Sequence, residues 1–335
     1  MRFILKTILL ILLALPVLSA QAQTARELTE QGIQLNNAKN YSGAIEKYTA
    51  ALALEPGNAT AKYQMAFSLN ALGKGAEALP YLQDVVKANP SAAVLQSSYT
   101  IMAAIYDRLG QAQNAINNYK AAIKLDSADY VLHYGLGLAY FRNKQYPQAE
   151  QSAVAAFKAD PSHAASLRLY GLVTFHQNKR APAILSLCQF LYLDPKGNRS
   201  EEAYSNILSI IQGGTLKAEP GVKSAQPSAD DVALNKAITT AIAEETQRRY
   251  LAPTHKFTSQ LQAIFAAVGP VAQKQSGSKF FRTQLAAFFY KLSQSEHMAA
   301  FAQYISQHND KKAADWVAAH AQQVDAMRKW VTDNN

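Results

Sequence analysis

Seven histidines and one cysteine are the residues of this chain best suited to metal binding or nucleophilic catalysis. No two histidines are three or four residues apart, which is the spacing that places two ligands on one face of a helix. A single cysteine excludes an intramolecular disulfide and a cysteine-based zinc site, and Cys188 lies in an apolar run where a buried, inert thiol is expected. The sequence therefore predicts no metal site, no cofactor and no cysteine nucleophile. The histidines are His133, His163, His176, His255, His297, His308 and His320.

Other signatures of catalysis are missing from the sequence. It contains no phosphate-binding P-loop, no nucleophile elbow, no HExxH motif and no dinucleotide fingerprint. Glu244-Glu245 and Arg248-Arg249 are four residues apart, a spacing typical of ion pairs on an exposed helix face. The net charge of +9 is spread along the chain without a basic stripe that carries interleaved aromatic residues, so nucleic-acid binding is not expected. We predict a protein that is not an enzyme.

The elements that position the remaining polar residues repeat along the chain. Five alanines recur at intervals of 34, 37, 34 and 34 residues, and a proline or serine follows each of them twelve residues later. A fixed period of roughly 20–50 residues is typical of stacked repeats, here pairs of helices joined by short turns. The alanines are Ala44, Ala78, Ala115, Ala149 and Ala183, and the residues that follow are Pro56, Pro90, Ser127, Pro161 and Pro195.

These repeats resemble the tetratricopeptide repeat (TPR) family over about residues 25–197. The family has small residues at positions 8 and 20 of each repeat, where paired helices approach closely; position 20 is alanine five times here. Departures include the lack of tryptophan at position 4. The resemblance implies an all-α, right-handed superhelical solenoid of five helix-turn-helix repeats, closed by a capping helix at 201–211. The residues at position 8 are Gly32, Ala66, Ala103, Gly137 and Gly171.

The amino-terminal segment 1–22 has the features of a signal peptide. Arg2 and Lys6 are basic, an apolar run follows, and Ala20-Gln21-Ala22 offers the small residues that signal peptidase requires. We expect cleavage after Ala22 or Ala20, and the alternative is an uncleaved membrane anchor. No other stretch is long and apolar enough to cross a membrane. The prediction is an exported, periplasmic or cell-envelope protein.

Residues 23–212 are predicted to form the solenoid, 213–229 a flexible linker rich in glycine and proline, and 230–335 a separate all-helical domain. Apolar residues recur at helical spacing beyond the linker, and Gly269-Pro270 is expected to end one of these helices. Phe280-Phe281 and Phe288-Phe289 are expected to pack in a core rather than bind a ligand. No family resemblance is evident in this region.

The resemblance implies that the first helix of each repeat lines a concave groove for a peptide or partner protein. The matching positions combine aromatic rings with amides and scattered charges, which suits an extended or helical peptide. The alternative is that some of them pack against the linker or the carboxy-terminal domain. The lysine, asparagine and arginine residues with which chaperone-tail-binding members clamp a terminal carboxylate are absent. The candidate groove residues are Asn36, Tyr63, Phe67, Asn70, Asp107, Tyr134, Phe141, Arg168 and Phe175, with Thr29, Thr100 and Leu138 at further matching positions.

The sequence thus favours a non-enzymatic, exported scaffold that binds a peptide or partner protein in the cell envelope. The alternative function is an unrecognised enzymatic or ligand-binding activity of residues 230–335, presented by the repeats. A deep polar pocket with ionisable groups would favour that alternative, and a closed aromatic core would argue against it. Self-association through the exposed ends of the repeat stack is a further possibility.

Overall fold

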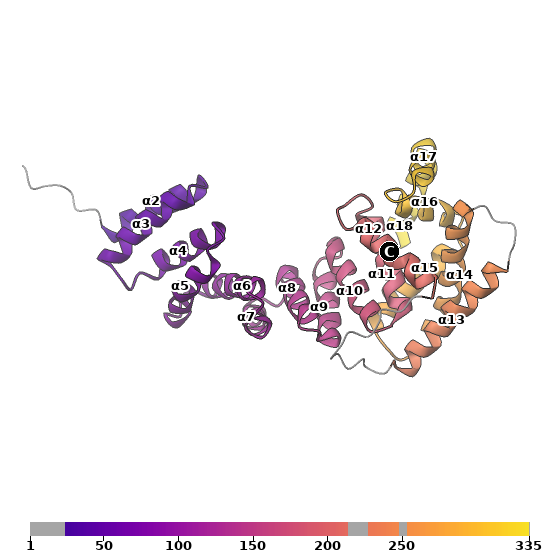
Figure 1. The fold of residues 1–335 in the computed structure, drawn as a ribbon, viewed down its shortest axis with the longest axis horizontal. Helices are drawn as coiled ribbons and strands as arrows, with labels where there is room; N and C mark the ends of the chain where they lie inside the picture. The colour runs from indigo at the N-terminus through magenta and orange to yellow at the C-terminus, as the bar shows by residue number, and fades with distance from the viewer. Residues whose placement is uncertain (1–23, 214–226, 248–252, 335) are drawn as a thin grey trace, which may run out of the picture. The chain divides into compact units, whose positions relative to one another are not determined.

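The computed structural model describes residues 24–213, 227–247 and 253–334, all of whose regular elements are helices (Figure 1). The predicted signal peptide and most of the predicted linker lie outside the described residues. The chain forms two compact units, the first ending at Leu125 and the second beginning at Asp126. No described helix combines the length and the apolar character needed to cross a membrane.

The first unit consists of three antiparallel helix pairs, one for each of the first three predicted repeats. The first helix of the third pair has 17 residues and begins at Ala92, one turn early, which accounts for the 37-residue interval. The pairs are α2 (Ala25–Asn37) with α3 (Tyr41–Leu54), α4 (Ala59–Ala71) with α5 (Gly75–Lys87), and α6 (Ala92–Arg108) with α7 (Ala112–Leu125).

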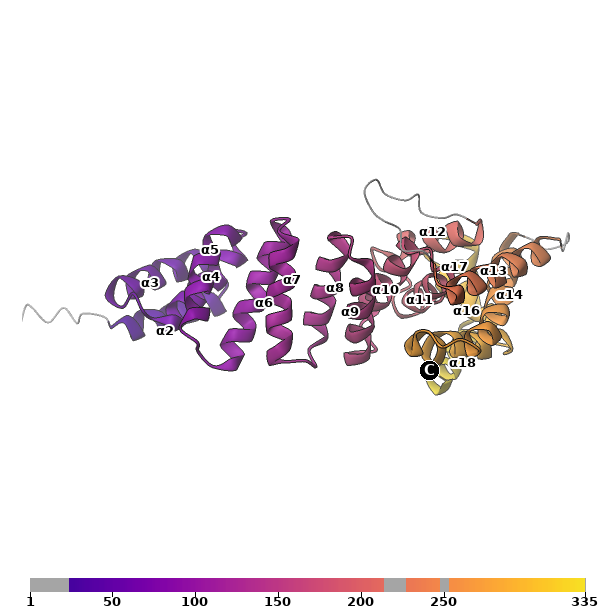
Figure 2. The same ribbon diagram turned by 90° about the horizontal axis from the view of Figure 1, so that it is seen from below.

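The second unit contains the fourth and fifth repeats, the capping helix and all the later helices. The repeats are α8 (Tyr130–Arg142) with α9 (Tyr146–Ala159), and α10 (Ala164–His176) with α11 (Arg180–Leu193); Figure 2 shows these helices in succession. The capping helix is α12 (Ser200–Ile211). The remaining helices are α13 (Ala229–Thr246), α14 (Pro253–Gln273), the π-helical turn η1 (Phe281–Ala286), α15 (Ala287–Ser293), α16 (Met298–Ser306), α17 (Lys311–Ala319) and α18 (Ala321–Asn334).

The turn inside each repeat has the same backbone geometry. One residue with a positive φ of 57–77° follows the first helix, and the next residue donates its N–H to a carbonyl five residues earlier at 2.8–2.9 Å. This Schellman arrangement satisfies carbonyls that the end of a helix leaves without partners. The positive-φ residues are Lys39, Gly73, Gly110, Lys144 and Asn178.

Lys39 adopts this left-handed conformation at a cost that glycine avoids. We expect Lys39→Gly to raise the free energy of unfolding of the first unit by about 0.5–1 kcal/mol, because the strain relieved exceeds the backbone entropy that glycine loses on folding. Chemical denaturation measures the change. Gly73→Lys is the matched reverse substitution: a β-carbon at Gly73 would meet no atom within 4 Å, so any loss of stability there reports backbone conformation alone.

The five periodic alanines are all fully buried. The close approach predicted at position 8 is also present, because a β-carbon on Gly32 would overlap the fully buried ring of Tyr48, and one on Gly171 would lie 2.8 Å from Leu187. Interiors this dense have no space for added methyl groups. The small residues are therefore packing residues, as the sequence indicates.

The last helix of the repeats, α11, is buried on every side. All residues from Arg180 to Leu191 are buried, and α11 contacts α10, α12, α13, α16 and η1. Figures 1 and 2 show α11 among α10, α12, α13 and α16. A helix that is apolar around its whole circumference requires cover from all directions. The helices beyond the linker provide this cover, so they share a compact unit with the fourth and fifth repeats. The unit boundary therefore lies between Leu125 and Asp126, whereas the sequence placed a domain boundary at 213–229.

A polar contact joins α13 to the turn before α11. The Asn235 side chain accepts a hydrogen bond from the Arg180 backbone N–H at 3.0 Å and donates one to the Asn178 carbonyl at 2.8 Å. The buried Arg180 guanidinium donates to Thr239 Oγ1 at 2.9 Å and to the Ile210 carbonyl at the end of α12. These bonds satisfy backbone groups at the ends of two helices and fix α13 against the last repeat.

An aromatic core lies within the later helices, as the sequence predicts for the phenylalanine pairs. Phe289 contacts Phe265 and Phe301 with ring centroids 4.6 and 5.8 Å apart, and all three side chains are fully buried. Helix α14 continues through Gly269-Pro270 to Gln273, so the expected helix end at this dipeptide is wrong. A β-carbon on Gly269 would lie 2.5 Å from Cβ of Tyr290, so the glycine is needed for the close contact between α14 and α15.

Candidate functional site

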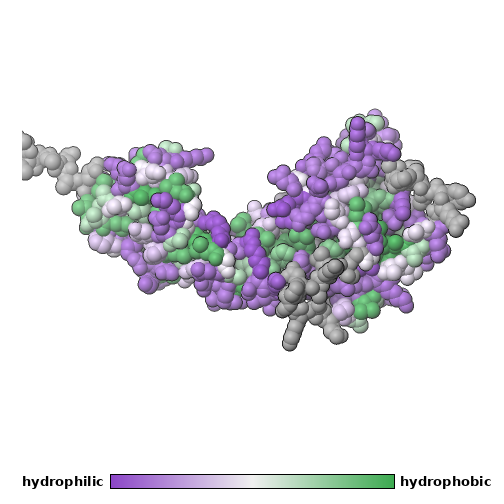
Figure 3. All heavy atoms as spheres, viewed as in Figure 1, coloured by the Kyte–Doolittle hydropathy of each residue, from purple (hydrophilic) through white to green (hydrophobic). Residues whose placement is uncertain are grey.

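The first unit presents an aromatic and polar surface on the first helices of its repeats. Phe67 of α4 is 40% exposed, and its ring lies edge-on to Tyr41 with centroids 6.4 Å apart. Asn70, one helical turn further along α4, accepts a hydrogen bond from Arg108 of α6. Tyr63 is half-buried and packs against the core of the unit. In Figure 3, exposed apolar side chains of the first unit lie between polar ones. Phe67 is thus the candidate side chain of this unit most available to a ligand.

Asn36 lies in the interior instead of on this surface. Its amide nitrogen donates to the Tyr48 hydroxyl at 2.9 Å and to Gln64 Oε1 at 3.3 Å, and its amide oxygen accepts from Ser68 Oγ at 2.7 Å. Thr29 is also buried, and its hydroxyl donates to the Ala25 carbonyl. The Asn36 amide therefore ties α2, α3 and α4 together and has no free group to offer a peptide. Asp107, also a candidate, is half-buried on α6.

In the second unit, the candidate aromatic residues contact histidine rings of the next repeat. Tyr134 lies edge-on to His163, with centroids 4.9 Å apart, and His163 also contacts Tyr130 at 4.7 Å. Phe141 contacts His176 at 5.1 Å, and the same imidazole stacks on Tyr146 at 5.0 Å. These are two aromatic clusters that the sequence did not predict, because spacing within one helix cannot show which rings meet across repeats.

The remaining two candidates differ in exposure. Arg168 of α10 forms an ion pair with Glu202 of α12, with Nη1 and Oε2 3.2 Å apart. Phe175 is only 3% exposed and is therefore a core residue rather than a surface one. Tyr134, Phe141 and Arg168 remain half-buried and partly accessible.

His163 gives the second unit a dependence on pH. Burial lowers the pKa of its imidazole below 6.5, and the nearby Asp160 carboxylate offsets part of this shift. His163 binds a proton more readily in the unfolded chain than in the folded one. The stability that His163 contributes is therefore fully present above pH 6.5 and decreases as the pH falls from 6.5 through the lower pKa of the folded state. We expect His163→Phe, which keeps an aromatic ring, to make the free energy of unfolding of the second unit depend less on pH in this range. An unchanged profile would show that another group titrates there.

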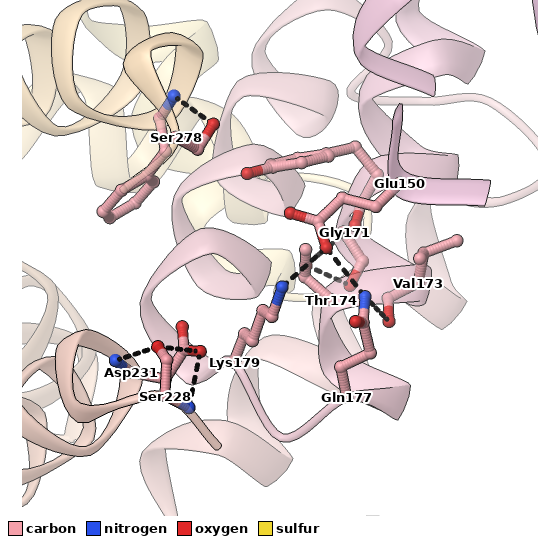
Figure 4. Close-up of polar contacts among 11 residues, drawn as sticks. Glu150, Gly171, Val173, Thr174, Gln177, Lys179, Ser228, Asp231 and Ser278 are labelled. Carbon is pink, nitrogen blue, oxygen red and sulfur yellow. Dashed lines mark hydrogen bonds and ion pairs between the residues drawn. The ribbon is translucent and has the colours of Figure 1, made fainter. Parts of the chain in front are cut away.

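A polar cluster lies within the repeats, between α9 and the turn that follows α10 (Figure 4). One oxygen of Glu150 accepts hydrogen bonds from Gln177 Nε2 at 2.8 Å and from Lys179 Nζ at 2.7 Å. The fully buried Tyr170 has its pKa raised, first by burial and then by the charge of Glu150. The ammonium group of Lys179 neutralises the charge of Glu150. Through these hydrogen bonds the cluster ties α9 to the turn between α10 and α11.

The described residues hold no group of three or more His, Cys, Asp or Glu side chains placed to bind a metal ion. Cys188 is fully buried, as predicted, and burial raises the pKa of its thiol. A thiol with these properties is a poor nucleophile.

The repeat geometry agrees with comparisons to known proteins. The family described as the Psidin N-terminal TPR repeats region matches residues 34–167. Residues 34–167 are a tetratricopeptide repeat region. The chain is also 31% identical over 141 residues to the heat shock protein STI1 of Saccharomyces cerevisiae, a match that covers 42% of this chain and 23% of STI1. It thus spans less than a quarter of that relative's length.

Among solved structures, the TPR protein YrrB, described as having an unusual peptide-binding site, aligns with a TM-score of 0.51 at 17% identity. The alignment covers 57% of this chain and 96% of YrrB. MamA aligns with a TM-score of 0.46 at 21% identity, over 49% of this chain and 94% of MamA. The YrrB likeness shows the solenoid fold. The TPR repeats form a protein–protein interaction scaffold.

Proposed function

We propose that this scaffold is exported to the cell envelope and that its TPR surfaces bind a peptide or partner protein there. Phe67 is the observation that supports the binding surface best. Its ring is exposed beside Tyr41 and is one helical turn from the polar pair of Asn70 and Arg108. An accessible aromatic anchor next to amide and guanidinium donors is the combination that recurs at peptide and protein interfaces.

Partner capture by the intact protein tests the binding surface. Crosslinking in the cell, followed by identification of the captured proteins, supplies the partner. We expect Phe67→Ala to lower the affinity for that partner about five-fold or more, because truncation of an interface anchor typically costs above 1 kcal/mol. Leu54→Ala is the matched control: Leu54 is 60% exposed but lies at the end of a second helix, α3. Equal affinities for the two variants would refute the assignment of the surface.

Export rests on the basic and apolar pattern of residues 1–22, which lie outside the described part of the chain. Cell fractionation and amino-terminal sequencing of the protein carrying a carboxy-terminal tag test it. We expect the protein in the envelope fraction, with a chain that begins at Gln23 or Gln21. A chain that begins at Met1 in the envelope fraction would identify the retained anchor instead, and a cytoplasmic location would overturn the proposal.

A further inference from the structure

A cavity of about 470 Å³ lies in the second unit, apart from the surfaces of the repeats. Side chains of α12, α13, α14 and α16 line it, together with Asp310, the residue that caps α17. This volume is within the range of roughly 300–1,000 Å³ that is typical of small-molecule sites. The cavity is therefore large enough for a small-molecule ligand.

Part of the cavity wall is apolar. Tyr204 of α12 and Phe257 of α14 line it, with ring centroids 5.3 Å apart, and Leu208 and Ile242 lie beside them. Rings and aliphatic side chains that face a cavity gain stability when an apolar ligand group covers them. This part of the wall fits an apolar side chain.

Gln260 of α14 supplies a polar group to the cavity wall. It is only 9% exposed, it lines the cavity, and its amide makes no hydrogen bond to another described residue. By contrast, Gln262 donates to the Ser293 carbonyl at 2.9 Å. The amide nitrogen and oxygen are not fully buried, so water in the cavity reaches them, and a ligand that offers a peptide group would replace that water at both the donor and the acceptor.

Two opposite charges also line the cavity. Lys256 of α14 forms no ion pair with another described residue. Asp310 accepts a hydrogen bond from the Lys312 N–H through Oδ1, which leaves Oδ2 available. Burial raises the pKa of the Tyr204 hydroxyl, and the charge of Asp310 raises it further. A ligand with both an ammonium and a carboxylate group would match these two charges.

We propose that this cavity binds a free dipeptide with apolar side chains. Asp310 binds the amino terminus, Lys256 binds the carboxylate, Gln260 hydrogen-bonds the central peptide group, and Tyr204 and Phe257 cover an apolar side chain. The tail of a partner protein would bring only one of the two terminal charges. The presence of both charges in one cavity therefore favours a free dipeptide over a chain terminus.

Calorimetric titration of the mature protein with L-leucyl-L-leucine tests the proposal. We expect saturable binding with a Kd of about 1 mM or tighter. The acetylated peptide and the carboxy-amidated peptide should each bind about ten-fold more weakly, because each loses one charge-assisted contact. No saturable binding, or equal binding of either blocked peptide, would overturn the proposal. Tight binding of the acetylated form alone would identify the site as one for protein tails.

Variants assign the contacts and separate a binding role from a structural one. Gln260→Leu should weaken binding about ten-fold. Lys256→Ala removes the contact with the peptide carboxylate, so the free and the amidated peptides should bind this variant equally well. Asp310→Asn keeps the helix cap but removes the charge that binds the ammonium group, so the free and the acetylated peptides should bind that variant equally well. Gln273→Leu, at the last residue of α14, and Lys274→Ala, in the turn that follows, are matched controls at exposed positions. If the cavity variants keep wild-type affinity and selectivity, the dipeptide binds elsewhere.

Neither binding nor failure to bind the dipeptide bears on the Phe67 surface, because Phe67 belongs to the other unit.

Discussion

Removal of the chain beyond Gly213 is expected to prevent the fourth and fifth repeats from folding stably. Such a fragment retains every predicted repeat and the capping helix, but it lacks α13, α16 and η1, which cover α11. Ile184, Leu185 and Leu191 of α11 are fully buried in the whole chain. Each large apolar side chain that becomes exposed costs about 1.5–3 kcal/mol. A few such losses equal the total stability of about 5–15 kcal/mol that is typical of a domain.

Hydrogen exchange of the fragment 24–213, followed by mass spectrometry, measures this effect. We expect amides of α10 and α11 to exchange far faster than in the whole chain, while those of α4 remain protected, because the first unit has its own core. A fragment that ends at Leu125 should give the same protection in α4. Addition of the separate segment 227–334 should restore protection to α11. Slow exchange of α11 in the fragment alone would show that the solenoid folds without the later helices.

The repeats could be predicted from the sequence because their determinants are local and periodic. Ala44 and its four equivalents must be small wherever two helices touch, and this constraint recurs once in each repeat. The contact between α11 and the later helices has no such period. The run Ile184-Leu185-Ser186-Leu187-Cys188 is apolar around most of the helix, and this pattern indicates that α11 is covered by further elements besides its neighbours in the repeats. What provides the cover could not be predicted, because α13, α16 and η1 are distant in sequence.

The candidate surface was predictable only in part, for a similar reason. A position in the repeat fixes the face on which a residue lies, and Phe67 and Phe141 do lie on accessible parts of the first helices. It does not fix which neighbours cover that face. Asn36 is covered by α3 and α4, and Phe175 is buried in the second unit. His163 and Tyr130 were not singled out because each completes a cluster only when adjacent repeats stack.

Asn36→Ala is expected to lower the free energy of unfolding of the first unit by about 2–4 kcal/mol. The substitution leaves the Tyr48 hydroxyl, which is fully buried, without its hydrogen-bond donor and opens a small cavity between three helices. Tyr48→Phe removes the hydroxyl and keeps the ring against Gly32, so it should cost only about 1 kcal/mol. Denaturant unfolding of the single and double variants measures both effects and their coupling.

The double variant decides between two roles for Asn36. If the amide acts by satisfying the buried hydroxyl, Asn36→Ala should be less harmful in the Tyr48→Phe background than in the wild type, with a coupling of about 1 kcal/mol. If Asn36 instead contacts a ligand, the substitution should weaken partner capture at temperatures where the variant is fully folded, and its effect on stability should be small. Full retention of binding with a large loss of stability is the result that the hydrogen bonds to Tyr48 and Ser68 require.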